Sequence, residues 1–238
     1  MSNIPDENYN IVDLLINTFD AFSRTTNQSI YVIDYFKKDF LYVSPNPLFL
    51  CGHTPEEVKK LGYMFYMLHV PEQEQDMLAE INRAGFIFFD KIPKEERCNY
   101  TIFYDFHLKK GKKQTLINHR LTPILLTNEG KIWLAICVVS LSSNHTAGHI
   151  ELRKTNQTSY WEYSLEGHRW KEIEGIILNE REKDILILSA QGYKIDEIAD
   201  HLCLATDTIK FYKRKIYDKL KVKNITEALS YAITHKIL

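Results

Sequence analysis

The sequence predicts an α+β protein, in which an antiparallel sheet with helices is followed by an all-helical C-terminal part. Residues 30–44 and 100–141 are rich in β-branched and aromatic residues and are interrupted by turn residues, as expected for antiparallel strands. After residue 178 the apolar residues instead recur at helical spacing. A chain of 238 residues with 45% hydrophobic and 26% charged residues is large enough for two folded domains.

The first predicted element is a helix over residues 11–22. Its apolar residues form one stripe that needs a partner: Ile11, Leu14, Leu15, Thr18, Phe19 and Phe22. Two strands follow, Ile30 to Tyr35 and Phe40 to Ser44, joined by a polar turn. Thr54 and Glu57 then form a capping box at the start of a short helix, and a further helix is predicted from Glu72 to a stop at Gly85.

Three long strands complete the predicted five-stranded sheet: Tyr100 to Leu108, Gln114 to Leu126 and Lys131 to Leu141. Residues 144–175 are predicted to form a small β-hairpin linker, in which Trp161, Tyr163 and Trp170 close a minor core or dock on a neighbour. The expected domains are an N-terminal helix (1–24), a sheet domain (25–143), the hairpin linker (144–175) and a helical domain (176–238).

The C-terminal segment predicts four helices. Asn179 and Glu182 cap the first, which ends near Gly192; the second runs from Asp196 to Leu202. The third opens within a few residues, giving a helix, a tight turn and a helix, and the fourth covers Thr226 to His235. Residues 178–238 carry 11 Lys and Arg against 9 Asp and Glu, and residues 210–223 hold seven basic residues against Asp218 alone. Such a patch suits nucleic acid.

The third helix has two distinct faces. Ile209, Tyr212, Ile216 and Leu220 form its inward stripe, whereas Lys210, Phe211 and Arg214 lie opposite. An exposed aromatic residue between two cations suits contact with DNA bases, so these three are the predicted base-reading residues. The predicted phosphate contacts come from residues that cannot read sequence: Thr206, Thr208, Lys213, Lys215 and Lys221.

Several blocks from Leu178 onward resemble the LuxR/GerE helix-turn-helix family: Leu178 to Glu182, Ala190 to Tyr193, Asp196 to Ala199, Thr208 to Lys210 and Ile216 to Val222. The resemblance implies a four-helix DNA-binding domain with a recognition helix over 207–219. It also implies a dimerising fourth helix, on which Thr226, Leu229 and Ile233 are the expected contacts. Lys194 and Ala205 depart from the capping serines usual in the family, so Thr206 is expected to cap the recognition helix.

Residues 30–141 look like a PAS domain, through the segments Gly52 to Val58 and His69 to Glu72. The whole arrangement is similar to one-component PAS-LuxR regulators of Bacteroidetes, which implies a sensory or dimerising N-terminal domain. No cofactor is required by the sequence. The Asn-Cys-Arg motif that forms a flavin adduct is missing. Haem is not favoured either, because the histidines that could bind it are isolated: His53, His69, His107 and His119. The aromatic residues of this domain are expected to fill its core, and the alternative is that they line a ligand cavity: Tyr63, Phe65, Tyr66, Phe86, Phe88, Phe89, Phe103 and Phe106.

These patterns predict a sequence-specific transcriptional regulator that binds double-stranded DNA as a homodimer, with a small-molecule ligand as a further partner of the PAS-like domain. An acyl-homoserine-lactone-type receptor with the same DNA-binding domain is the alternative, although the receptor's Trp/Asp pattern is missing. No catalytic motif supports an enzyme. No signal peptide or membrane-length apolar run is visible, and the four cysteines are isolated, so a cytoplasmic protein with reduced thiols and no membrane partner is expected.

Overall fold

The computed structural model describes residues 11–235 and 237–238, and the chain divides into two compact units, Met1–Ile173 and Glu174–Leu238. In the first unit, α1 (Val12–Ser23) precedes β1 (Ser29–Asp34) and β2 (Asp39–Val43). Helices α2 (Pro47–Leu50), α3 (Pro55–Leu61), α4 (Met64–His69) and α5 (Glu72–Asp90) come next, followed by a 3-10 helix, Lys94–Asn99. The remaining strands are β3 (Tyr100–Lys110), β4 (Lys113–Leu126), β5 (Ile132–Leu141), β6 (Ile150–Lys154), β7 (Tyr160–Ser164) and β8 (Arg169–Ile173).

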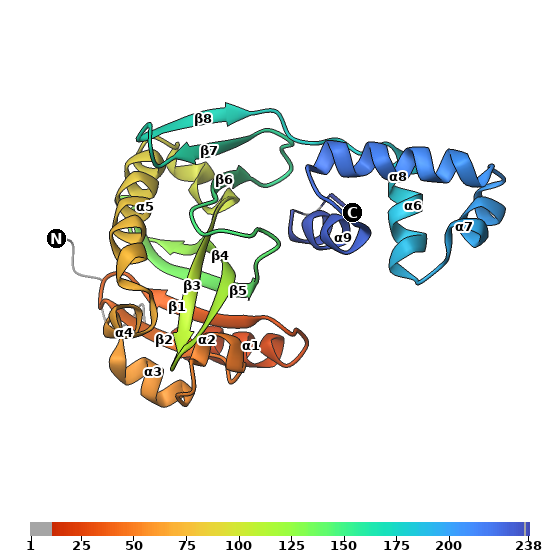
Figure 1. The fold of residues 1–238 in the computed structure, drawn as a ribbon. Coiled ribbons are helices and arrows are strands. Elements are labelled where there is room, and N and C mark those ends of the chain that lie inside the picture. Colours follow the sequence, from red (N-terminus) through yellow and green to blue (C-terminus); the bar gives the residue numbers. More distant parts are fainter. Residues whose placement is uncertain (1–10, 236) are drawn as a thin grey trace. The chain divides into compact units, whose positions relative to one another are not determined.

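The described strands form one antiparallel sheet in the order β2-β1-β5-β4-β3-β6-β7-β8 (Figure 1). Its first five strands are the predicted PAS-like sheet, with the short helices inserted between β2 and β3, so this part of the prediction is confirmed. Strand β1 is buried along its whole length because it has neighbours on both faces. Residues Tyr31 and Ile33 pack with the helices between β2 and β3, and Ile30 and Val32 pack under α1.

The strand count corrects the prediction for residues 144–175. They do not form a small separate hairpin: β6 pairs with β3, so that Ile102 lies opposite Leu152, and β7 and β8 extend the sheet further. Pairing covers the backbone edge that β3 would otherwise leave open. Trp161 and Trp170 both contact Phe88 of α5, with ring centroids 5.3 and 5.2 Å apart, which anchors these strands on that helix.

Helix α5 also runs longer than the sequence indicates. Gly85 does not end it; the helix continues to Asp90. An added Cβ at Gly85 would lie 3.2 Å from the Cδ1 atom of Ile102, so the glycine permits close packing of α5 against β3. The residue that resembles a C-terminal stop therefore serves a tertiary contact.

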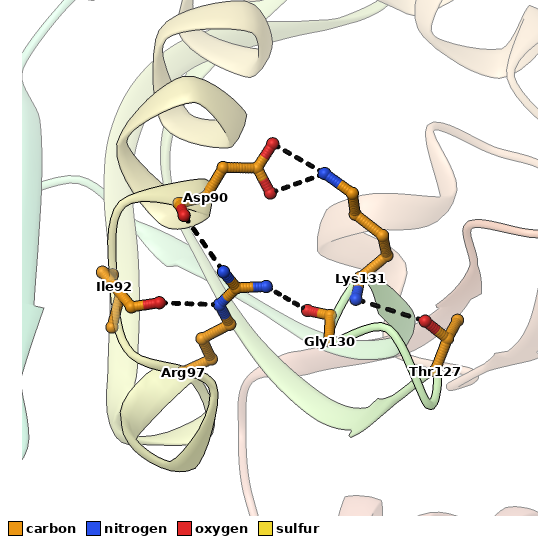
Figure 2. A network of polar contacts seen from close by, with 6 residues as sticks. All are labelled: Asp90, Ile92, Arg97, Thr127, Gly130 and Lys131. Atoms are coloured by element: carbon orange, nitrogen blue, oxygen red, sulfur yellow. Dashed lines mark hydrogen bonds and ion pairs between the residues drawn. The ribbon is translucent and has the colours of Figure 1, made fainter.

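The end of α5 is tied to the turn between β4 and β5 by Arg97, as Figure 2 shows. Its guanidinium donates to the carbonyl oxygens of Ile92 at 2.9 Å, Gly130 at 2.6 Å and Asp90 at 3.0 Å. The Asp90 carboxylate in turn accepts from Lys131 Nζ at 2.7 and 2.8 Å. One side chain thus satisfies three backbone carbonyls from two segments far apart in sequence.

The apolar stripe predicted on α1 is divided between two environments. Val12 is buried against the sheet, with Leu15, Ile16 and Phe19 packed beside it. Leu14 remains 66% exposed, and Ile11 and Phe22 are also exposed. Of the six residues of the predicted stripe, the protein's own sheet therefore covers Leu15 and Phe19, and the other four are exposed.

The second unit contains α6 (Glu180–Ala190), α7 (Ile195–Leu202), α8 (Thr206–Leu220) and α9 (Ile225–Thr234). Its core contains Leu178, which precedes α6, together with the inward residues of all four helices: Ile185, Leu186, Ile198, Ala199, Ile209, Ile216, Leu220, Ala228 and Ala232. The predicted all-helical C-terminal domain is confirmed.

Candidate functional site

A tight turn between α7 and α8 builds the helix-turn-helix. Cys203 adopts a left-handed conformation (φ 51°), and the Leu204 N–H donates to the Ala199 carbonyl at 2.9 Å. Helix α8 starts with Ala205 as its N-cap, which has no side-chain cap, so the expected cap by Thr206 is wrong. The helix begins one residue earlier than that cap requires, and the packing of Ile209 and Ile216 in the core holds it there instead.

The two faces of α8 separate as predicted. Ile209, Ile216 and Leu220 are buried, whereas Lys210, Phe211 and Arg214 are exposed, Phe211 by 56%. Lys210 Nζ lies 3.0 Å from Asp207 Oδ1 in an exposed pair one turn apart, which leaves the ammonium group accessible to other anions. The structure therefore presents the three predicted base-reading side chains together on an open helix face.

The predicted phosphate contacts differ in accessibility. Lys215 and Lys221 are exposed, whereas Thr206, Thr208 and Lys213 are half-buried. Burial lowers the pKa of Lys213. Lys215 Nζ lies 3.5 Å from Glu182 Oε1, so its charge is shared with a carboxylate of its own domain. Of these lysines, Lys221 is therefore the best placed to meet a phosphate without first leaving an internal partner.

Glu182, which the sequence predicts only as part of a helix cap, is a buried carboxylate that lies within reach of two lysines. Its side chain is fully buried, accepts from the Asn179 N–H at 3.0 Å and accepts from Lys219 Nζ at 2.6 Å. Burial would raise the pKa of Glu182, but the bonds from Lys219 and Asn179 and the charge of Lys215 outweigh it and lower the pKa. Spacing within α6 predicts the cap; only packing of α8 on α6 brings the lysines to it.

The predicted dimerisation residues lie on α9, which Asn224 caps by accepting from the Glu227 N–H at 3.0 Å. Ile233 is 65% exposed and Thr226 is also exposed. Leu229 is partly covered by the core of its own domain. The helix therefore retains an open face that contains one large apolar side chain.

A second candidate site is a cavity of about 370 Å³ in the N-terminal unit, between helices α4 and α5 and strands β1, β3 and β4. The residues that line it are Ile33, Tyr35, Tyr63, Tyr66, Met67, Val70, Gln75, Leu78, Ala79, Asn82, Phe86, Tyr104 and Leu121. Of the aromatic residues predicted from the sequence, Tyr63, Tyr66 and Phe86 line this cavity. The others pack elsewhere: Phe65 and Phe106 in the core, Phe88 against the tryptophans, Phe89 beside an adjoining hollow of about 40 Å³, and Phe103 in β3.

The four histidines considered as haem ligands, His53, His69, His107 and His119, are engaged with protein groups. His53 and His69 face each other with their Nε2 atoms 2.9 Å apart, and His107 Nδ1 lies 2.7 Å from Glu74. His119 is buried and bonds the Tyr31 hydroxyl through Nε2. None of the four is among the described residues that line the cavity or the adjoining hollow.

Tyr31 links His119 to the cavity. Its hydroxyl bonds both His119 Nε2 and the hydroxyl of Tyr66, and Tyr66 is one of the cavity-lining residues. Burial lowers the pKa of His119 to about 3 and raises the pKa values of Tyr31 and Tyr66 well above 10.0. All three groups are therefore uncharged at neutral pH.

Taken with its buried core, the exposed face of α8 makes the C-terminal unit a helix-turn-helix domain. It is a LuxR-type domain: residues 177–232 match the family described as bacterial regulatory proteins, luxR family. The resemblance seen in the sequence blocks is thereby confirmed. Among curated proteins, the response regulator protein VraR of Staphylococcus aureus and that of Staphylococcus saprophyticus are 39% identical over 62 residues, 26% of this chain and 30% of theirs. The chain thus spans less than a third of the length of these relatives.

Similar solved structures extend over more of the chain at low identity. The VqmA dimer of Vibrio cholerae is 15% identical with a TM-score of 0.36 and covers 93% of this chain and 88% of that chain. A VqmA complex with ligand and DNA gives 14% and 0.36, over 93% and 87%. A sensory box histidine kinase/response regulator of Burkholderia thailandensis gives 10% and 0.36, over 52% and 82%. At these TM-scores the likeness carries no argument about the ligand or partners of this chain.

Within the described residues, no helix is long and apolar enough to cross a membrane.

Proposed function

We propose that the protein is a cytoplasmic, sequence-specific DNA-binding transcriptional regulator that acts by binding and has no catalytic role. The observation that carries this proposal is the exposed face of α8, where Lys210, Phe211 and Arg214 project from a helix whose other side is packed in the domain core. A helix of this kind enters the major groove, where cationic side chains donate to guanine and an apolar side chain contacts thymine methyl groups.

In this proposal the basic residues around the recognition helix have separate roles. Lys210, Phe211 and Arg214 read bases, while Thr206, Thr208, Lys213, Lys215 and Lys221 hold phosphates. The exposure of Lys221 and the pairing of Lys215 with Glu182 support unequal contributions of these residues to DNA affinity, with Lys221 contributing more than Lys215.

The regulator is proposed to act as a homodimer, with Thr226, Leu229 and Ile233 of α9 in contact with a second copy. Two recognition helices then meet two half-sites about one DNA turn apart. The N-terminal unit, with its cavity, serves as the sensory domain. An acyl-homoserine-lactone receptor is not favoured, because neither Trp nor Asp is among the cavity-lining residues.

Selection from a random DNA pool with the full-length protein tests this function. The expected result is enrichment of an inverted repeat, bound at least about a thousand-fold more tightly than random DNA at physiological salt. Absence of any enriched sequence, together with equal affinity for all duplexes, would overturn the proposal. A variant with Lys210, Phe211 and Arg214 all changed to alanine is the control, because these side chains are exposed and their removal leaves the core intact.

A further inference from the structure

The cavity of the N-terminal unit has an unusual chemical composition for its size. None of the described residues that line it is an Asp, Glu, Lys, Arg or His, and its polar groups are tyrosine hydroxyls and the amides of Gln75 and Asn82. Burial raises the pKa of Tyr63 to about 12 and raises the pKa values of Tyr35 and Tyr104 well above 10.0, so the tyrosines are neutral. A charged ligand would lose its water without gaining an opposite charge, which is costly.

The direction of the hydrogen bonds from His119 through Tyr31 to Tyr66, which lines the cavity, can be assigned. His119 Nδ1 is buried and has no hydrogen-bond partner among the described residues. If this nitrogen carried the proton, a buried N–H would be left without an acceptor, which is rarely tolerated. We therefore assign the proton to Nε2, so that His119 donates to the Tyr31 oxygen.

The remaining bonds of the chain follow from this assignment. Tyr31 accepts from His119, and its own proton has two candidate acceptors, the Tyr66 oxygen and the Cys137 sulfur. We assign it to the Tyr66 oxygen, because sulfur is the weaker acceptor. The Tyr66 hydroxyl has no other protein partner within the described residues, and its proton remains available. Because hydrogen bonds in a chain polarise one another, Tyr66 is a stronger donor than an isolated tyrosine.

We propose that the cavity binds a small, uncharged and mostly apolar molecule through a single hydrogen-bond acceptor, such as a carbonyl oxygen, that receives the Tyr66 proton. Apolar side chains from α4, α5 and the sheet enclose the rest of the molecule. The role of this molecule as the signal of the regulator rests on the proposed function. Its binding to the cavity does not depend on that function.

Calorimetric titration of the full-length protein with three matched probes tests the proposal. Acetophenone carries the acceptor, ethylbenzene keeps the ring and the two-carbon chain without the carbonyl oxygen, and benzoate adds a charge. Acetophenone is expected to bind about five-fold more tightly than ethylbenzene, the usual contribution of one hydrogen bond. Benzoate is expected to bind at least about ten-fold more weakly than acetophenone. Equal affinities for acetophenone and ethylbenzene, tighter binding of benzoate, or no binding of any probe would overturn the proposal.

Tyr66→Phe should abolish the preference for acetophenone and leave the affinity for ethylbenzene unchanged. Tyr63→Phe is the matched control, since Tyr63 also lines the cavity but its hydroxyl is not part of the Tyr66–Tyr31–His119 chain. The preference of this variant for acetophenone over ethylbenzene should persist. If Tyr66→Phe does not fold, the ¹⁵N resonances of His119 in the unaltered protein give a second measurement. They should move with acetophenone and not with ethylbenzene, and unchanged resonances would contradict the chain.

The two proposals fail separately. Probe binding without any DNA selectivity would overturn the regulator function and leave the cavity assignment intact. DNA selectivity without probe binding would overturn only the cavity assignment.

Discussion

The Nζ atom of Lys219, on α8, lies 2.6 Å from the Oε2 atom of the fully buried Glu182, on α6. The same lysine donates to the Ile177 carbonyl at 3.3 Å, and Glu182 also receives the Asn179 N–H. The pair therefore joins the recognition helix to the first helix of its domain and to the segment that precedes it.

We expect Glu182→Gln to destabilise the C-terminal unit by about 1–3 kcal/mol, less than for a fully buried pair because the lysines are partly exposed. Glu180→Gln is the control: its pair with Lys183 is exposed, and the change should be below about 0.5 kcal/mol. Unfolding followed by far-UV circular dichroism measures both. The lowered pKa of Glu182 means that its contribution is full above the ordinary carboxyl range and is lost as the pH falls through the folded-state pKa.

His119 predicts a separate pH dependence for the N-terminal unit. Its pKa is about 3 in the folded protein against 6.5 for the free side chain, so the unfolded chain binds the extra proton between these values. Stability is therefore full above pH 6.5 and falls by up to about 1.4 kcal/mol per pH unit below it. All three tryptophans, Trp133, Trp161 and Trp170, lie in this unit, so urea unfolding by fluorescence at pH 7 and 5.5 reports it. If the stability is the same at pH 7 and pH 5.5, and His119→Gln does not alter this, the lowered pKa of His119 is contradicted.

Base reading and phosphate binding should separate in DNA titrations. Arg214→Ala is expected to lower the ratio of operator to random-DNA affinity. The difference in binding free energy should fall by about 1–3 kcal/mol, because a cation that donates to guanine discriminates between bases. Lys221→Ala should weaken both affinities by similar factors and reduce the salt slope by about 1. Titrations at several salt concentrations measure both effects. An unchanged ratio in Arg214→Ala would mean that this helix face does not read bases.

The oligomeric state tests the exposed apolar side chains. A homodimer is expected in sedimentation at micromolar concentration, and Ile233→Glu should shift it toward monomer because a charge would be buried at the contact. Leu14→Glu makes the same change on the exposed side of α1 and shows which unit carries the contact. A monomer in the unaltered protein, with and without DNA, would refute the dimer.

Arg97 is expected to stabilise the N-terminal unit through its three carbonyl bonds. Arg97→Ala should cost about 1–3 kcal/mol, since the carbonyls lose a charged donor. Lys131→Ala, which removes only the exposed pair with Asp90, should cost less than about 1 kcal/mol. Tryptophan fluorescence during urea unfolding compares the two; equal losses would argue against the Arg97 contacts.

Local patterns predicted much of this molecule because they depend on neighbouring residues. The capping boxes at Thr54 and Asn179 and the inward stripe of α8 are present as expected, since caps and helical periodicity are decided within one or two turns. The exposed face with Lys210, Phe211 and Arg214 follows from the same periodicity. By itself, the sequence therefore determined the two kinds of fold, the C-terminal family and the face of α8.

Tertiary packing decided what no local pattern contains. Residues 144–175 became sheet because the edge of β3 was open and Phe88 offered a contact to two distant tryptophans. Gly85 stayed helical because Ile102 approaches it closely. The Tyr66–Tyr31–His119 chain joins residues up to 88 positions apart, and the Glu182–Lys219 pair joins residues 37 apart. Such contacts depend on how the chain folds back on itself, and spacing along the sequence carries no information about them.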